Sequence, residues 1–190
     1  MTLSIVTWNI WKYTQISESL PRFLETKQVA LDLPEIQTNL LTEISADKCL
    51  QAYKQIWWPV LVDDSWIYFD AFNQFPWALS KFLYEWVWIE WMRRMYAWEE
   101  NTMAVFECVL SYIDETLQEP LQFIGQVTWT ITFDFVNQID ENPKLPYDLI
   151  FQPDGMNKPA IFDMDLWKNE YNHRVRAVKK FNEWVLSNKK

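Results

Sequence analysis

The residue types that most often carry out chemistry are scarce in this chain, with the exception of carboxylates. It has one histidine, His173, and two cysteines, Cys49 and Cys108, with no second Cys or His at metal-ligand spacing beside either cysteine. We expect both cysteines to be buried. His173 lies about 200° around the predicted last helix from the apolar Tyr171, so we expect His173 to be exposed. Any catalysis would therefore rest on Asp and Glu.

One set of carboxylates could form such a site, because the turns of a predicted hairpin bring them toward one end: Asp148, Asp154, Asp163 and Asp165. A cluster of this kind could bind Mg²⁺ or perform acid–base chemistry. Turn and helix-cap roles account for the same residues, since Asp is favoured in both places. We therefore predict no catalytic residue, metal or cofactor, and keep this metal site as a weaker alternative.

Two short strings resemble motifs of known enzyme families. Residues 160–165, AIFDMD, are similar to the nucleophile strand of haloacid dehalogenase-like phosphatases. Residues 5–11, IVTWNIW, resemble the first strand of endonuclease/exonuclease/phosphatase enzymes, with Asn9 at the metal-site position. The first motif opens a whole domain, for which too little chain follows here, and the second family needs two histidines. The two glycines also exclude the Gly-rich loops of dinucleotide and P-loop sites.

The charge of the chain is −9 and is unevenly distributed. Residues 61–120 hold eleven acidic and three basic residues, whereas residues 161–190 hold seven basic and four acidic ones. An acidic body repels nucleic acids and anionic lipids, so we expect any macromolecular partner to be a protein with a basic surface. Residues 75–98 carry too many charges for a membrane-spanning helix, and the N-terminus lacks the features of a signal peptide. We predict a cytoplasmic protein.

Hydrophobic periodicity and breaker residues predict the elements of the fold. They are a strand at 3–11, short helices between 19 and 58, two short strands around an Asp-Asp-Ser turn at 63–65, helices at 77–98 and 102–119, a strand at 126–135, a hairpin of strands 147–152 and 160–163, and a C-terminal helix at 165–187. The strand at 126–135 has the clearest pattern, because apolar and polar residues alternate along it.

These elements predict an α+β fold in a single domain, residues 1–190. A mixed or antiparallel sheet of about 4–6 strands would pack against a Trp-rich helical middle and a C-terminal amphipathic helix. The helix-rich middle would span about residues 19–119, and a strand-rich part at about 120–163 would pair with the N-terminal strand.

The thirteen tryptophans are the most unusual feature, and eight of them lie between residues 57 and 98. So many indoles cannot all be buried and hydrogen-bonded in a domain of this size, so we expect some on the surface. The best candidates for an exposed binding face are Trp88, Trp91, Arg94 and Trp98. The acidic residues that would steer a basic partner toward it are Asp63, Asp64, Asp70, Glu99, Glu100, Asp114 and Glu115.

The function that these features favour is protein binding, as an inhibitor or immunity-type protein that occludes a basic partner, and they leave open whether the protein is an enzyme. The first alternative is a small-molecule binding domain or carboxylate-based enzyme with an aromatic-lined pocket. The second alternative is a structural subunit of a larger complex, in which a neighbour covers the aromatic face.

Overall fold

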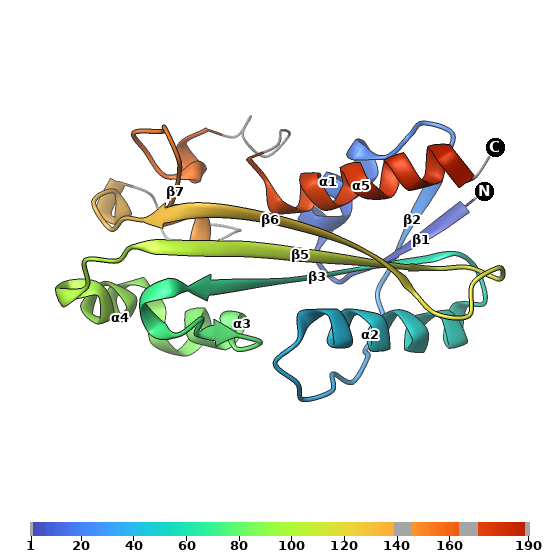
Figure 1. Ribbon diagram of the computed structural model, residues 1–190, viewed down its shortest axis with the longest axis horizontal. Coiled ribbons are helices and arrows are strands. Elements are labelled where there is room, and N and C mark those ends of the chain that lie inside the picture. Colours follow the sequence, from blue (N-terminus) through green and yellow to red (C-terminus); the bar gives the residue numbers. More distant parts are fainter. Residues whose placement is uncertain (1, 139–145, 164–170, 189–190) are drawn as a thin grey trace. The chain divides into compact units, whose positions relative to one another are not determined.

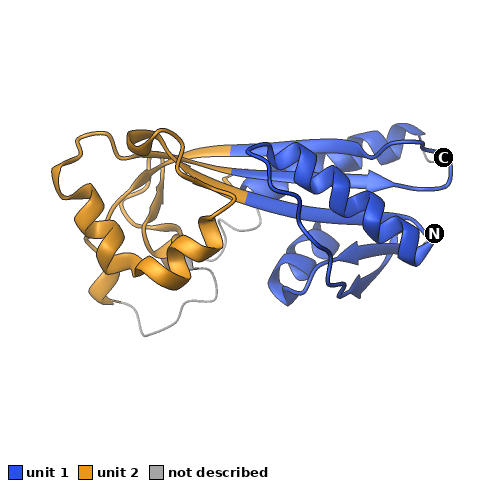
Figure 2. Ribbon diagram, turned by 90° about the horizontal axis from the view of Figure 1, so that it is seen from below, with its two compact units in different colours: residues 1–65, 107–126, 172–190 blue, residues 66–106, 127–171 orange. Residues whose placement is uncertain are grey.

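The computed structural model describes residues 2–138, 146–163 and 171–188, and these form an α+β fold with one mixed sheet (Figure 1). The predicted fold class is confirmed. Residues 1–65, 107–126 and 172–190 make up one compact unit, called unit 1, and residues 66–106 and 127–171 make up unit 2 (Figure 2). Strands β3, β5 and β6 run through both units. The assignment of residues 1–190 to a single domain stays a prediction.

The sheet has the strand order β2-β1-β3-β5-β6-β7, and β4 pairs with β3. The strands are β1 Thr2–Val6, β2 Glu25–Val29, β3 Val60–Phe69, β4 Pro76–Trp77, β5 Met103–Ile113, β6 Leu121–Ile131 and β7 Phe151–Pro153. Strand β1 is parallel to β2 and to β3, whereas the β3–β4 and β6–β7 pairs are antiparallel. Parallel neighbours require crossover connections, and two helices supply them.

Unit 1 has helices on both faces of the sheet, and the alternation of strand side chains explains why. Helices α1 Ile10–Ser19 and α5 His173–Asn188 lie on one face, and α2 Leu41–Ile56 lies on the other (Figure 1). On the α1/α5 face, the strands bury Leu3, Ile5, Leu61, Leu110 and Tyr112 against Ile16 and Phe181. On the α2 face they bury Val6, Val60, Val62 and Ile113 against Cys49 and Ala52. The β1–α1–β2 and β2–α2–β3 crossovers therefore cover opposite faces.

Unit 2 packs an aromatic core around its own segments of β3, β5 and β6. Its helical part is broken into α3 Ser80–Phe82, a π-helical turn Leu83–Val87 and α4 Trp88–Met95. The predicted continuous helix at 77–98 is therefore wrong. The break falls at the start of α4, where Trp88 has a φ of 62° and a ψ of 161°, far from the angles of a regular α-helix. The core of the unit includes Phe69, Met92, Tyr96, Phe106, Trp129 and Phe151.

Two further helix predictions are wrong. Residues 102–119 hold strand β5, and residues 25–29, expected in a helix, form strand β2. Strand β5 is buried on both faces over its second half, so its sequence lacks the alternation that marks a half-buried strand. The two short strands predicted around residues 63–65 are one continuous strand, β3. Strand β6 agrees with the predicted alternating strand, although it begins and ends earlier in the chain.

The C-terminal part departs from prediction in its details. Helix α5 is present, while residues 164–170 at the expected start of the last helix lie outside the described residues. The expected hairpin strand at 160–163 is a 3₁₀ turn at Ala160–Phe162, and only Phe151–Pro153 of the other strand pairs with β6. Within the described ranges, no helix is long and apolar enough to cross a membrane.

Candidate functional site

Two adjacent aspartates on β3 lie at the point where the parallel part of the sheet ends. Strand β1 ends at Val6, which pairs with Val62, so Asp63 and Asp64 extend just past its carboxyl end. Their side chains point to opposite faces of the sheet because neighbours in a strand alternate. Both are buried, with 5% and 8% of their surface exposed. The prediction that they are exposed acids is wrong.

Asp63 lies on the α1/α5 face between two cations. Lys12 Nζ on α1 is 2.7 Å from its Oδ1, and Arg174 on α5 donates from Nε to Oδ2. Arg174 also donates to Gln15 Oε1 at 2.7 Å and to Ser65 Oγ at 3.1 Å. Burial would raise the pKa of Asp63, but Arg174 and Lys12 outweigh burial and hold this pKa well below its ordinary value. Asp63 is therefore a permanent negative charge inside the fold.

Asp64 lies on the α2 face and is less completely satisfied. Lys48 Nζ on α2 is 2.5 Å from its Oδ1 and 3.0 Å from Glu35 Oε1. Its other oxygen, Oδ2, is buried and has no hydrogen-bond partner among the described residues. Burial raises the pKa of Asp64 above its ordinary value, and the attraction of Lys48 and Lys12 offsets this only in part. Asp64 therefore combines a raised proton affinity with a free acceptor atom.

The turn between β1 and α1 is fixed beside these aspartates. Asn9 caps α1 by accepting from the backbone N–H groups of Trp11 and Lys12 at 2.9 and 3.4 Å. The Asn9 N–H donates to Thr7 Oγ1 at 3.1 Å, and Gln28 Nε2 donates to the Thr7 carbonyl at 3.0 Å. The helix start, with its partial positive charge, is thereby held at the carboxyl end of β1.

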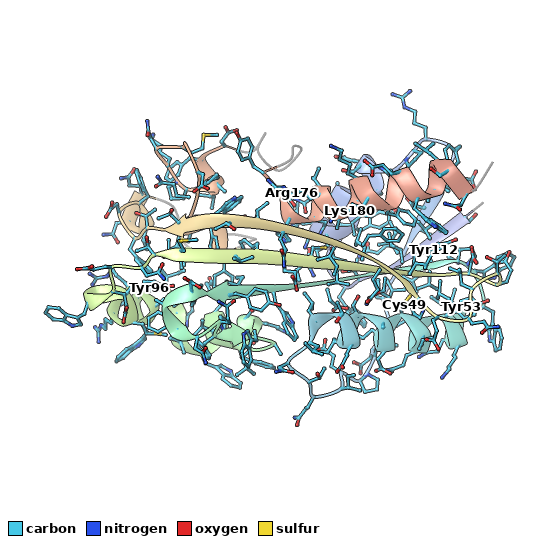
Figure 3. The ribbon with its side chains drawn as sticks, in the orientation of Figure 1. Cys49, Tyr53, Tyr96, Tyr112, Arg176 and Lys180 are labelled. Carbon is cyan, nitrogen blue, oxygen red and sulfur yellow. The ribbon has the colours of Figure 1, made fainter. Side chains whose placement is uncertain are left out.

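Helix α5 is fixed on β6 by two basic side chains, which brings Arg174 to Asp63. Arg176 Nη1 donates to the Gln126 carbonyl at 2.8 Å, and Lys180 Nζ donates to the Ile124 carbonyl at 2.6 Å (Figure 3). Four residues of a helix rise about 6 Å and two residues of a strand about 6.8 Å, so these spacings match.

Gly125, between those two carbonyls, allows the backbones of β6 and α5 to meet. A Cβ atom added at Gly125 would lie 2.0 Å from the His173 carbonyl oxygen and 2.5 Å from the Ala177 nitrogen. His173, at the start of α5, is buried, which corrects its predicted exposure. Burial and the charge of Arg174 lower the pKa of His173 far below its ordinary value, so its ring is neutral at physiological pH.

These groups, called the charged cluster, are Lys12, Lys48, Asp63, Asp64 and Arg174 of unit 1. They surround the carboxyl ends of parallel strands whose crossovers lie on opposite faces, where open α/β sheets bind ligands. Lys12 and the start of α1 suit an anion, since Lys12 keeps 25% of its side chain exposed. A buried carboxylate with a raised pKa suits proton abstraction. The arrangement fits hydrolysis of an anionic substrate.

The other predicted site residues do not join this cluster. Trp88, Trp91, Arg94 and Trp98 are exposed in unit 2, with the Arg94 guanidinium 4.4 Å from the centre of the Trp91 ring. Asp70, Glu99 and Glu100 are also exposed in unit 2, and Glu115 is exposed in unit 1. Asp114 is buried in the β5–β6 turn, where it accepts from Tyr112 Oη at 2.6 Å and from the Thr116 N–H at 2.9 Å.

The alternative metal set is not assembled among the residues that can be described. Asp148 is buried, Asp154 and Asp163 are exposed, and Asp165 lies outside the described residues. No group of three or more His, Cys, Asp or Glu in the described ranges could hold a metal ion. Cys49 and Cys108 are buried free thiols, as predicted, although Cys108 lies on a strand. Its thiol is 3.4 Å from Asp63 Oδ2.

The three basic residues of the charged cluster belong to no local motif, because they come from three distant parts of the chain: Lys12, Lys48 and Arg174. Two signals could have indicated them. Gly125 directly precedes the clear strand pattern of residues 126–135 and lies within β6, where a glycine marks a close approach of another backbone. The apolar run before Asp63 is typical of a buried parallel strand, and acidic residues directly after such a run lie where ligands bind.

Comparison with known proteins identifies relatives along the whole chain. Residues 3–184 match the Ham1 family. The dITP/XTP pyrophosphatase of Methanopyrus kandleri is 30% identical over 99% of this chain and 98% of its own length. The dITP/XTP pyrophosphatase of Methanosarcina acetivorans is 33% identical over 96% of this chain and 96% of its own length. Among solved structures, the Ham1 protein of Staphylococcus aureus covers 100% of both chains with a TM-score of 0.79 at 19% identity. That of Coxiella burnetii covers 98% of this chain and 99% of its own, with a TM-score of 0.78 at 23% identity.

These matches overturn the prediction of an inhibitor or immunity protein that binds a basic partner. The relatives are named as enzymes that act on nucleotides, so the alternative of an enzyme for a small molecule fits better than either protein binding or a structural subunit. Exclusion of Gly-rich phosphate loops did not exclude a nucleotide substrate, because a helix start and basic side chains can also hold phosphates. From the match over residues 3–184 and the 30–33% identity to full-length relatives, the chain belongs to the Ham1 family.

Proposed function

We propose that this protein hydrolyses nucleoside triphosphates such as dITP and XTP to the nucleoside monophosphate and pyrophosphate. The observation that carries the proposal is the charged cluster at the carboxyl end of β1, in a chain whose relatives over nearly its full length are named dITP/XTP pyrophosphatases. A site for this reaction must hold a polyanion and activate a water molecule. The cluster supplies groups for both tasks.

Lys12 and the start of α1 would hold the triphosphate. Lys12 is the most exposed cation of the cluster, while the side chain of Arg174 is 4% exposed and remains on Asp63. When a triphosphate arrives, Lys12 can turn from Asp63 to a phosphate oxygen, because Arg174 alone still neutralises Asp63. The N–H groups of Trp11 and Lys12 in the first turn of α1 already donate to Asn9, so the helix start would contribute its partial positive charge to phosphate binding. Asp63 would be a positioning residue that orients both cations.

Asp64 would act as the general base. Its free Oδ2 can accept a proton from a water molecule, and its raised pKa increases its affinity for that proton. The water oxygen forms a bond to the α-phosphorus, the bond from this phosphorus to the α–β bridging oxygen breaks, and pyrophosphate leaves with that electron pair. The proton remains on Asp64 and then passes to solvent. Lys48 would keep the carboxylate in place through Oδ1.

A substrate panel and a pair of lysine variants test this proposal. Purified protein is incubated with dITP, XTP, dATP, dGTP and inorganic pyrophosphate in Mg²⁺-containing buffer, and the products are separated by anion-exchange chromatography. We expect turnover of dITP and XTP. Lys12→Met should raise the KM for dITP at least about tenfold, because a charge-assisted hydrogen bond contributes about 1.5–3 kcal/mol.

Lys54→Met is the matched control, because Lys54 is an exposed lysine near the end of α2 with no ion pair among those described. It should leave both kcat and KM unchanged. Equal effects of the two substitutions, or absence of turnover with every nucleotide, would contradict the proposal. A cytoplasmic location, where such nucleotides would be met, remains part of the proposal.

A further inference from the structure

Helix α2, which carries Lys48, is attached to the sheet by buried polar side chains as well as by apolar contacts. Ser45 Oγ donates to the Val109 carbonyl at 3.2 Å and accepts from Ser111 Oγ at 2.8 Å. About one turn further along α2, Cys49 Sγ donates to the Ser111 carbonyl at 3.2 Å. Ser45, Cys49 and Ser111 are 0% exposed. Hydrogen bonds depend on direction, so these contacts fix one position of the helix on β5.

The contacts are made at matching intervals along the helix and the strand. The two α2 side chains are four residues apart, a rise of about 6 Å, and the two β5 carbonyls are two residues apart, about 6.8 Å. Gln122 on β6 adds a further contact, because its Nε2 donates to the Thr42 carbonyl at 2.7 Å and to Ser111 Oγ at 3.2 Å. Cys49 lies on the side of α2 that faces the sheet (Figure 3). With Lys48 on β3, α2 makes polar contacts to three neighbouring strands.

The position of α2 decides which oxygen of Asp64 Lys48 binds. Lys48 Nζ is 2.5 Å from Oδ1, while Oδ2 is the buried acceptor with no partner among the described residues. A lysine ammonium is a point charge on a flexible stem, so it can bind either oxygen, depending on where the stem begins. Lys48 directly precedes Cys49 and follows Ser45 by three residues, so its stem begins on the turn that these two residues fix. A displaced turn would bring Lys48 to Oδ2.

We infer that Ser45 and Cys49 are positioning residues, which hold Lys48 on Oδ1 of Asp64 and thereby keep Oδ2 available to the attacking water. This role rests on the proposed function. It concerns turnover rather than substrate binding, because Lys12, the cation proposed to hold the triphosphate, lies on the other face of the sheet. Loss of these contacts should therefore lower kcat and leave KM nearly unchanged.

Three variants measure the effect. Ser45→Ala removes the hydroxyl that contacts Val109 and Ser111, and kcat for dITP should fall by about 2- to 10-fold, the range that one neutral hydrogen bond contributes. Cys49→Ala should lower kcat as well. Cys49→Ser keeps a donor for the Ser111 carbonyl and should restore kcat toward the wild-type value.

The matched control is Tyr112→Phe, which also removes one buried hydroxyl from β5. Tyr112 Oη donates to Asp114 at 2.6 Å, but this side chain packs on the α1/α5 face, away from α2. Both Tyr112→Phe and Ser45→Ala should lower the midpoint of urea unfolding, because each loses a buried hydrogen bond. Only Ser45→Ala should lower kcat, whereas a merely structural role would give the two variants the same kcat.

A second comparison tests whether Ser45 acts through Lys48. In a Lys48→Met background there is no ammonium to misplace, so Ser45→Ala should lower kcat no further. The same two substitutions also give a test that needs no turnover. Their losses of unfolding free energy in urea should be less than additive in the double variant, because Ser45 positions the side chain that Lys48→Met removes.

The experiment measures kcat and KM for dITP, urea unfolding and far-UV circular dichroism for the wild type and these variants. A fall in kcat for Ser45→Ala that is absent from Tyr112→Phe and disappears in the Lys48→Met background supports the inference. Unchanged kcat in Ser45→Ala, an equal fall in Tyr112→Phe, or an undiminished fall in the Lys48→Met background overturns it.

Failure of the proposed function gives a different result, namely no hydrolysis of any nucleotide by the wild type. The stability measurements then decide the role of Ser45, and additive losses in Ser45→Ala and Lys48→Met overturn it. The same measurements decide if Lys48→Met has no detectable turnover. If Ser45→Ala is misfolded, Cys49→Ala replaces it in every comparison, and unchanged kcat in that variant overturns the inference.

Discussion

Removal of the Arg174 side chain tests how the charged cluster is held together. Arg174→Met leaves Asp63 with Lys12 as its remaining cation in the cluster and removes hydrogen bonds to Gln15 and Ser65. The paired side chains of Arg174 and Asp63 are 4% and 0% exposed, and removal of one partner from such a buried pair costs about 3–5 kcal/mol. Lys12 stays 2.7 Å from the carboxylate, so we expect a loss near the lower limit, about 3 kcal/mol.

The assay is urea unfolding followed by circular dichroism, for the wild type, Arg174→Met, Asp63→Asn and the double variant. The double variant should lose less stability than the sum of the two single changes, because Asn leaves no uncompensated buried charge. Arg93→Met, which removes an exposed ion pair to Glu90, is the control and should leave the midpoint unchanged. A loss below about 1 kcal/mol for Arg174→Met would refute the reasoning, since that is the size of an exposed pair.

The difference in stability between the wild type and Arg174→Met should also depend on pH, which gives a second test of the Arg174–Asp63 pair. The pKa of Asp63 is lower in the folded protein than in the unfolded chain, so its ionised form contributes stability. This contribution is fully present above the ordinary Asp pKa of about 3.9 and is lost as the pH falls toward the folded pKa. Removal of Arg174 raises the folded pKa of Asp63, so the advantage of the wild type over Arg174→Met should shrink as the pH falls from the pKa of Asp63 in the variant toward its lower pKa in the wild type.

Three further outcomes follow from the site. Gly125→Ala should lower the free energy of unfolding in urea by about 1–3 kcal/mol and reduce activity, because a Cβ cannot fit 2.0 Å from the His173 carbonyl oxygen. Gly155→Ala is the control, because the space around Gly155 is open. It should lower the free energy of unfolding by about 1 kcal/mol, through the φ of +79° at this position. Asp64→Asn should lower kcat by about 10²- to 10⁴-fold. In the wild type, kcat should rise with pH as Asp64 loses its proton at its raised pKa. If the same rise of kcat with pH persists in Asp64→Asn, Asp64 is not the general base. Asn9→Ala should reduce the stability by about 1 kcal/mol through loss of the α1 cap, and an unchanged urea midpoint would show that the cap is dispensable.

The parts of the fold that could be predicted from sequence are those where one local pattern dominates. Strand β6 has one polar and one apolar face, and its alternation predicted it. Strand β5 was mistaken for a helix because its second half is buried on both faces, which removes the alternation and leaves an apolar run that also fits a helical stripe. Such a run is ambiguous until its neighbours are known.

The site was harder to predict because its buried charges are neutralised by residues that lie far away in the sequence. Adjacent aspartates usually indicate a turn, and Asp63 and Asp64 were interpreted in that way. They lie inside β3 because Lys12 and Arg174 neutralise one and Lys48 the other, each from a helix on the matching face. No local pattern contains this pairing, which depends on crossovers that place helices on both sides of the sheet.

The most direct test of the account is hydrolysis of dITP by the wild-type protein in ¹⁸O-labelled water, with mass spectrometry of the products. The account predicts dIMP and pyrophosphate in equal amounts, with the label in dIMP, because water attacks the α-phosphorus. Formation of dIDP and phosphate, label in pyrophosphate, or no turnover would contradict it.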